Sequence, residues 1–289
     1  MVRLLMSLLL CAGLTAGAQA TTFIYKNDFD GTWPPQTRLA EDTDMSGNKV
    51  PWAFNFSSTY KRSGTHSLRI ENRPEGSIDD GGKRRREVEP RESLLGEARV
   101  YLLEDVHNWI AFSLMLDPNW ASSMRDSDKE IIILQNISRK TETSWKPEYH
   151  WILREDGRLR IERSWVDSAG NRQRSSNSIT TLEPGKWYDI VIHRYRKSDS
   201  SGRNRLWIDG KLVSDITGPN MLWDYNLKGA LHKWGPYTGT DGTSTYVMYF
   251  DNMKVARGTF TDGYDAVNPA AGASPQAPSP PQSLTLTKH

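Results

Sequence analysis

Short segments of alternating apolar and polar residues, separated by hairpin dipeptides, run through most of this chain and limit the folds it can adopt. The dipeptides that mark the turns are Asp156-Gly157, Pro184-Gly185, Ser201-Gly202 and Asp209-Gly210. Strands do not alternate with helices along the sequence, which argues against a parallel sheet. We therefore expect an all-β protein, a concanavalin-like β-jelly roll sandwich of two antiparallel sheets with a concave groove.

The expected strands follow the alternation and its turn signals. They are residues 22–25, 66–71, 85–89, 109–116, 130–136, 149–154, 158–165, 187–195, 205–208, 211–216 and 245–255, with a further short strand at 233–237. Only residues 98–105 and 119–125 have a weak helical pattern.

The first 20 residues have the pattern of a secretory signal peptide. Arg3 supplies the positive start, an apolar stretch follows, and Ala18-Gln19-Ala20 supplies a cleavage site of small residues. We expect a secreted or periplasmic protein; a lipid anchor at Cys11 is the alternative. Because Cys11 is the only cysteine, the mature chain would contain no disulfide.

The other end, residues 265–289, is rich in Pro, Ala and Ser and is expected to be disordered. Residues 21–264 between the two ends form one predicted jelly-roll domain. The formal charge is +2, or +1 once Arg3 is removed. A nearly neutral chain gives no sign of a nucleic-acid or membrane partner; we expect neither, and a monomer.

The segment from Lys233 to Tyr237 reads Lys-Trp-Gly-Pro-Tyr and places an ammonium and a phenol four residues apart on one short strand. Because side chains alternate along a strand, Lys233, Gly235 and Tyr237 should share a face. Gly235 would leave that face open to a bulky ligand. A cation beside a phenol suits an anionic substrate that must give up or accept a proton.

A charged run at residues 83–89 should present Arg85, Glu87 and Glu89 on one face. A guanidinium held in place by a neighbouring Glu can bind a carboxylate through two parallel hydrogen bonds. A solvated edge strand is the alternative. The Glu87–Glu92 stretch also resembles the Glu-x-Asp-x-x-Glu signature of jelly-roll β-glucanases, but the flanking arginines would lower carboxyl pKa values, the wrong direction for a general acid.

Two polar residues on apolar strands are further candidates. Gln135 ends the apolar run Ile131–Leu134, and a buried amide there is either a structural clamp or a donor into a cleft. His150 lies in Tyr149-His150-Trp151; a single strand histidine is more often structural than a base.

Metal-binding patterns of the HExxH or CxxC type are absent from the sequence, so zinc is not expected. Asp30 and Asp251 lie near the two ends of the domain, where the terminal strands of a sandwich are often neighbours. Their oxygens could hold a structural Ca²⁺. The alternative is that both are ordinary polar residues at the surface.

Taken together, these segments resemble the polysaccharide lyases of the heparin lyase I and glucuronan lyase type. The resemblance covers most of the domain, and jelly-roll alginate lyases are similar in their Arg-x-Glu, Gln and Lys-x-Gly-x-Tyr strands. The matching segments, in chain order, are 63–70, 85–87, 109–113, 118–120, 132–135, 184–187, 191–193, 206–211, 233–237 and 249–251.

The resemblance implies a β-jelly roll that binds an acidic polysaccharide and cleaves it by β-elimination. Arg85 and Gln135 would bind the uronate carboxylate and stabilise an enolate-like intermediate. Tyr237 would protonate the leaving O4, and Lys233 would assist the phenol and contact substrate. Further substrate contacts are expected from Glu87, Arg154, His193 and Trp234.

One position departs from the pattern of the group. Its Gln strand often continues as Gln-x-His, with the histidine as the base that removes the C5 proton, whereas this chain has Ile137. The base is then His150, with His193 as second choice, or Tyr237 acts as both acid and base. A non-catalytic carbohydrate-binding sandwich and a jelly-roll glycoside hydrolase are the alternative functions.

Overall fold

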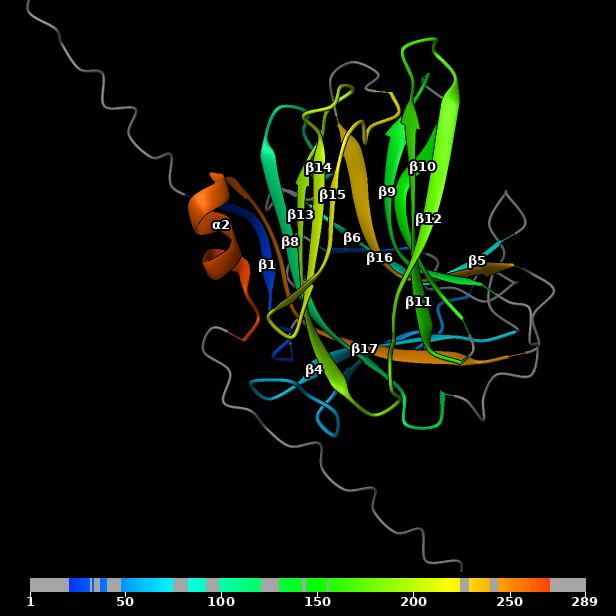
Figure 1. Ribbon diagram of the computed structural model, residues 1–289. Coiled ribbons are helices and arrows are strands. Elements are labelled where there is room, and N and C mark those ends of the chain that lie inside the picture. Colours follow the sequence, from blue (N-terminus) through cyan, green and yellow to red (C-terminus); the bar gives the residue numbers. More distant parts are fainter. Residues whose placement is uncertain are drawn as a thin grey trace, which may run out of the picture.

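The structure, a computed structural model, is a sandwich of two antiparallel β-sheets with the helix α2 on its outer side (Figure 1). It describes residues 21–31, 33, 37–40, 48–74, 83–91, 99–120, 130–141, 144–154, 156–223, 229–239 and 244–270. The expected signal peptide and most of the expected tail lie outside these residues. Within them, no helix is both long and apolar enough to cross a membrane.

The first sheet has eight strands among the described residues. Their order is β15 (Lys211–Thr217), β14 (Arg203–Ile208), β13 (Trp187–Tyr195), β8 (His107–Leu116), β17 (Tyr246–Gly258), β4 (Ser67–Asn72) and β3 (Phe54–Ser57), with β1 (Thr22–Asn27) also paired to β17. The longest strand, β17, thus contacts both the N-terminal and the central strands, which makes the ends of the domain neighbours.

The second sheet has nine described strands. Their order is β12 (Arg172–Thr181), β11 (Arg158–Val166), β10 (Trp145–Leu153), β9 (Ile131–Arg139), β16 (Ala230–Gly239), β6 (Glu87–Pro90) and β2 (Thr37–Ala40); β5 (Lys83–Arg85) and β7 (Tyr101–Leu102) also pair with β16. Strand β16 therefore brings segments from both halves of the chain together in the centre of this sheet.

Large apolar side chains fill the space between the sheets. The ring of Phe112, from the first sheet, lies with its centroid 5.8 Å from Trp151 and 6.2 Å from Trp234, both from the second sheet. All three are fully buried. Because removing one such side chain from water contributes about 1.5–3 kcal/mol, these contacts between the layers stabilise the sandwich without any disulfide.

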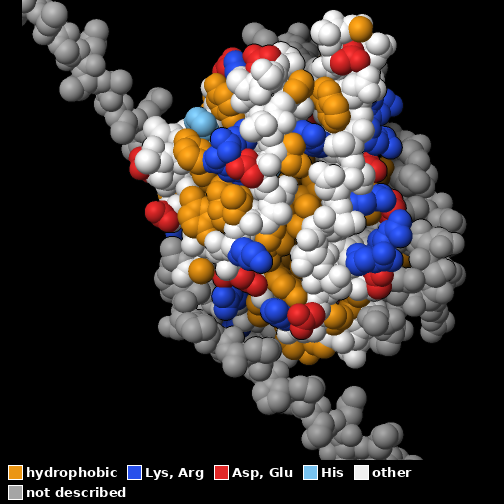
Figure 2. All heavy atoms as spheres, in the orientation of Figure 1, with side chains coloured by type: hydrophobic (Ala, Val, Ile, Leu, Met, Phe, Trp, Pro, Cys, Tyr) orange, Lys and Arg blue, Asp and Glu red, His pale blue; other side chains and the backbone are white. Residues whose placement is uncertain are grey.

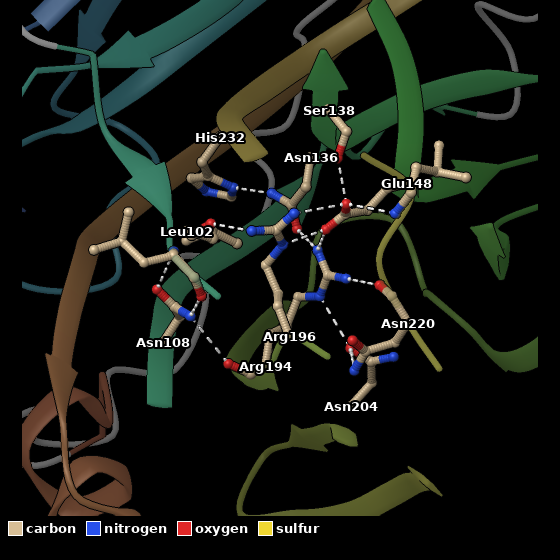
Figure 3. A network of polar contacts seen from close by, with 12 residues as sticks. Leu102, Asn108, Asn136, Ser138, Glu148, Arg194, Arg196, Asn204, Asn220 and His232 are labelled. Carbon is tan, nitrogen blue, oxygen red and sulfur yellow. Dashed lines mark hydrogen bonds and ion pairs between the residues drawn. The ribbon is translucent and has the colours of Figure 1, made fainter. Parts of the chain in front are cut away.

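The interior also contains a buried polar network (Figure 3). The carboxylate of Glu148 on β10 pairs with Arg194 at 3.0 Å and with Arg196 at 2.6 Å, both from β13 and its end. Arg194 also donates to Asn136 on β9 at 2.9 Å. None of these three charged side chains is exposed, so the two sheets are joined by ionic as well as apolar contacts.

The predicted all-β jelly-roll fold is confirmed, and the predicted strands correspond to observed ones with shifted ends. Strands β2, β3 and β12 were not predicted. The sequence of β12 is polar and lacks alternation, yet it pairs along β11 as an edge strand, where polar side chains stay in water. The weak helix expected at 98–105 is wrong, because that segment contains β7; residues 121–125 of the other one lie outside the described part.

The helix α2 (Phe260–Val267) was not predicted either, and it continues past the expected domain end at residue 264. It packs on the outer face of the first sheet, where Val267 and Trp109 belong to a small apolar cluster separate from the main core. A Cβ on Gly263 would lie 2.0 Å from Nε1 of Trp109. The missing side chain therefore lets the helix approach the indole directly.

Candidate active site

A cleft of about 610 Å³ opens on the face of the second sheet that is turned away from the core. Its charged lining residues are Arg38, Arg85, Glu89, Arg99 and Lys233. Gln135 and Tyr237 add polar groups, and the apolar lining is Ile132, Ile137, Trp145, Pro147 and Leu231. The cleft therefore combines four cations with one carboxylate, a phenol and an apolar wall.

Strand register explains why these side chains meet. Lys233 on β16 is paired with Gln135 on β9, which is paired with His150 on β10, which is paired with Glu162 on β11. Directly opposed residues of antiparallel strands point to the same face, with Cβ atoms about 4.5–5.5 Å apart. The four residues thus form one polar row across the sheet.

Tyr237 lies at the other end of the cleft, where β16 pairs with β5. Its register partner is Arg85, whose Cζ atom is 6.0 Å from the centre of the phenol ring. Tyr237 is half-buried and Arg85 is 24% exposed, so the cleft reaches both. The expected meeting of Lys233, Tyr237, Arg85 and Gln135 in one cleft is what the structure shows.

Gly235, between the lysine and the tyrosine, does not open the face to a ligand as expected. It has φ of +117° within a bulge of β16, and a Cβ there would lie 2.1 Å from the carbonyl oxygen of Arg86. The space is filled by the protein's own backbone. Glycine is needed here so that β16 can bend against the segment joining β5 to β6.

Arg84 and residues 86–89 of the charged run are buried, which rules out the alternative of a solvated edge strand. Nζ of Lys233 lies 2.7 Å from Oε1 of Glu89 and 3.5 Å from Oε2 of Glu87. Burial raises the pKa of Glu87 even though Lys233, Gln135 and Arg85 oppose the shift. Burial would also raise the pKa of Glu89, but Lys233, Arg38 and Arg99 outweigh it and lower the pKa.

Gln135 is both a clamp and a cleft residue. Its Nε2 donates a hydrogen bond to Oε1 of Glu87, and its side chain also lines the cleft. The hydrolase alternative fits this arrangement poorly. Glu87 and Glu89 are nearly inaccessible and share Lys233 as a partner, so neither carboxyl is placed as a free general acid.

His150 lies on the cleft side of the sheet but outside the cleft lining. Its Nε2 is 2.7 Å from Oε2 of Glu162, and its Nδ1 is buried with no partner among the described residues. Burial lowers the pKa of the imidazole in spite of Glu162. Neither ring nitrogen opens onto the cleft, so this position does not support the expected role as the C5 base.

Two of the expected substrate contacts, His193 and Trp234, are wrong, and a third, Arg154, lies outside the residues that line the cleft. His193 packs against Trp109 and His107 on the outer face of the first sheet, because β13 belongs to that sheet and not to the sheet that carries the cleft. Trp234 points into the core, since it alternates with Lys233. Arg154 is exposed at the end of β10, where it pairs with Glu130 at 3.2 Å.

Comparison of the sequence with known families identifies the family of this chain. The sequence profile of the family described as Polysaccharide lyase matches residues 30–254, which is most of the chain. The chain belongs to the polysaccharide lyase family. No curated protein matches its sequence.

Solved structures show the same fold in other lyases. The endo-β-1,4-glucuronan lyase from the fungus Trichoderma reesei is 16% identical, with a TM-score of 0.64 over 86% of this chain and 99% of that one. Alginate lyase A1-II′, of polysaccharide lyase family 7, is 14% identical, with a TM-score of 0.55 over 78% and 96%. Alginate lyase PA1167 from Pseudomonas aeruginosa is 14% identical, with a TM-score of 0.53 over 78% and 99%.

The lyase has cleft residues that the sequence did not reveal. Arg38 comes from the four-residue strand β2, and Arg99 from a segment expected to be helical. Trp145 is the first residue of β10, and Cζ of Arg139 lies over its ring at 4.5 Å from the ring centre. Register through a central strand brings these distant segments together, and the only local signal was an aromatic residue beside cations.

The two acidic residues expected to bind calcium in this lyase both hold the loop at residues 62–66. Oδ1 of Asp30 accepts the N–H of Thr65 at 2.5 Å, and Oδ2 of Asp251 accepts the N–H groups of Arg62 and Ser63 at 3.0 and 3.1 Å. Burial raises the pKa of Asp251 to about 7, and the nearby charge of Asp30 adds to the shift.

Proposed function

We propose that this lyase is secreted and cleaves a uronate-containing acidic polysaccharide by β-elimination. The observation that carries the proposal is the meeting of Tyr237, Arg85, Gln135 and Lys233 in one cleft. An acidic sugar would find there both cations for its carboxylate and a phenol for proton transfer. The non-catalytic alternative gives no reason for a phenol and a lysine to remain in one such cleft.

The first requirement of β-elimination is neutralisation of the carboxylate at C5. The C5 proton is weakly acidic while that carboxylate carries its full charge, and hydrogen-bond donors aimed at the developing enolate lower the barrier. The Arg85 guanidinium can give two parallel hydrogen bonds. The Gln135 amide, oriented through its bond to Glu87, would give another from the neighbouring strand.

The second requirement is proton transfer at the scissile bond. Tyr237 is the register partner of Arg85, so a uronate bound through Arg85 would place its C4–C5 edge near the phenol. As the C4–O4 bond breaks, the phenol O–H would protonate the leaving oxygen. Lys233, held by Glu89, keeps a positive charge on the same side of the sugar.

The relatives narrow the class of polymer that we propose. The similar structures are those of a glucuronan lyase and of alginate lyases, and both polymers consist of uronates. Basic side chains gather over the region of β11 and β12 (Figure 2). Arg160 and Arg174 lie there beside Glu162, so an acidic chain leaving the cleft would meet further cations.

A screen of uronate polymers tests the proposed function. Purified enzyme is incubated with glucuronan, alginate, heparin-type polymers and hyaluronan, and the ultraviolet absorbance of the new C4–C5 double bond is recorded. At least one polymer should give this signal together with chain shortening. Reducing ends without unsaturation would indicate hydrolysis instead, and binding without any cleavage would contradict the proposal.

Secretion and calcium are further parts of the proposal. Secretion predicts that the mature protein begins at Thr21 when its N-terminus is sequenced. Asp30 and Asp251 suit Ca²⁺, which prefers carboxylate and carbonyl oxygens. Within the described residues no third Asp, Glu, His or Cys joins them. The remaining ligands would then be neutral oxygens, and the ion would hold the 62–66 loop against β17.

The raised pKa of Asp251 gives this calcium proposal a pH signature. Without the ion, the folded protein holds a proton that the unfolded chain loses above about pH 4, so stability falls as pH rises from 3.8 to about 7. A shift of about three units corresponds to at most about 4 kcal/mol. We expect the melting temperature in chelator to fall over this range more steeply than in Asp251→Asn. Added Ca²⁺ should raise it at pH 7.5, and no rise there would contradict calcium binding.

A further inference from the structure

We propose that the cleft selects uronates whose C5 hydrogen and C4 oxygen lie on the same face of the sugar ring, because Tyr237 alone carries out both proton transfers. Such uronates are 4-linked D-glucuronate and D-mannuronate. In L-guluronate, L-iduronate and D-galacturonate the two groups lie on opposite faces. This inference rests on the proposed β-elimination and adds the stereochemical class of its substrate.

The stereochemistry follows from the path of the proton. The base removes the C5 proton, the electron pair of the C–H bond becomes the C4–C5 double bond, and the C4–O4 bond breaks with its pair on O4. O4 then takes a proton. When both groups are on one face, a phenolate can take the C5 proton and return it to O4, so the phenolate is regenerated with no other reactant. When they are on opposite faces, a second group must act from the far side of the ring.

On the side of the sugar ring that would face the phenol, Tyr237 is the residue that can exchange a proton among the described residues of the cleft lining. The other ionisable lining residues are Arg38, Arg85, Arg99, Lys233 and Glu89. Arginine does not deprotonate in proteins. Lys233 and Glu89 are held together at 2.7 Å, and Arg38 lies 3.4 Å from the same carboxylate. These cations lower the pKa of Glu89, which makes it a weak base.

On the far side, the cleft wall is apolar. Ile137 lies two residues beyond Gln135 on β9 and therefore points to the same face, with Pro147 and Leu231 as lining neighbours on the adjacent strands. None of these side chains can accept a proton. A uronate held by Gln135 and Arg85 would thus present one ring face to the phenol and the other to hydrocarbon.

The histidines do not supply the missing base. Five of the six lie in the described part of the chain, and none of these five lines the cleft. His150 is bound to Glu162 with its other nitrogen enclosed, His232 is between the sheets, and His107 is bound to His193 on the outer face. His66 is at the loop that Asp30 holds.

Polymannuronate and polyguluronate test this inference because their residues differ only in configuration at C5. Initial rates of double-bond formation are compared on both polymers, with glucuronan and polygalacturonate as a second pair. We expect kcat/KM to be at least about 100-fold higher on polymannuronate or glucuronan than on their opposite-face counterparts, as loss of one acid–base group costs 10²–10⁴-fold. Cleavage of polyguluronate or polygalacturonate at equal or higher rates overturns the inference while β-elimination stands. Absence of unsaturated product from every polymer overturns both.

A pair of variants tests the cause of the selection. Ile137→His places a base on the far wall, whereas Ile137→Asn makes the same wall polar without a comparable base. The ratio of guluronate to mannuronate cleavage should rise at least tenfold in Ile137→His relative to Ile137→Asn. Equal ratios in the two variants would show that the missing base at this wall does not set the preference, and would overturn the inference. Circular dichroism of both variants verifies the fold.

Discussion

Replacement of Tyr237 by Phe should lower kcat by about 10³-fold or more while leaving substrate affinity within a few-fold of the wild type. The expected loss is large because, on our proposal, the hydroxyl is both the proton donor to O4 and the base. The ring itself stays, so its packing against Arg85 is kept. Turnover is measured as double-bond formation, and affinity by isothermal titration with an acidic oligosaccharide that the variant does not cleave.

A matched control distinguishes loss of chemistry from loss of fold. Tyr264→Phe removes the same hydroxyl from α2, which packs on the outer face of the opposite sheet. That variant should keep wild-type turnover. If Tyr237→Phe retained more than a tenth of kcat, the phenol would not be the proton-transfer group, and the proposed mechanism would fail even if the enzyme cleaves uronates.

The part of this site that could be predicted is the part that depends on alternation along one strand. Arg85, Glu87 and Glu89 share a face because each is two residues from the next, and the same rule places Lys233 on the cleft side. It also shows why Trp234 could not be a substrate contact. An aromatic side chain next to a cleft-facing lysine must point the opposite way, in this case into the core.

The rest depended on which strands become neighbours, and local pattern does not determine that. His193 and His150 both lie on apolar strands with similar sequence patterns, but β13 joins the first sheet and β10 the second. Arg38 reaches the cleft on β2, which pairs with β6, and Arg99 precedes β7 and forms an isolated bridge with Arg91, so both positions depend on distant segments. The resemblance to lyases suggested Tyr237 as the proton donor that we propose, whereas the register of β9 with β10 showed where His150 lies.

The largest expected effect on stability is that of Glu148→Gln in the buried network of Figure 3. Burial alone would raise the pKa of Glu148, but Arg196 and Arg194 outweigh it and bring the pKa down to about 2. The carboxylate is therefore charged in the folded state and neutralises two arginines that have no exposure. Removing one member of such a group leaves buried charge without compensation, which costs about 3–5 kcal/mol.

The network also lies directly beneath the polar row that contains Gln135 and Lys233. Asn136 and His232 are hydrogen-bonded at 2.6 Å and are register partners, one residue along β9 and β16 from the Gln135–Lys233 pair. Arg194 connects Asn136 to Glu148. Loss of the carboxylate should therefore loosen the strands that orient the cleft, and we expect kcat/KM of Glu148→Gln to fall at temperatures where the protein remains folded.

Glu130 provides the matched control for Glu148, because it also pairs with two arginines, Arg154 and Arg160, but at the surface. Glu130→Gln should cost no more than about 1 kcal/mol, since exposed pairs are screened by water and salt. Urea unfolding of both variants at constant m-value measures the difference. The stability that Glu148 contributes should be present above pH 4.5, its ordinary pKa, and should be lost as pH falls toward about 2. Equal losses in the two variants would show that the sheets are joined by apolar packing alone.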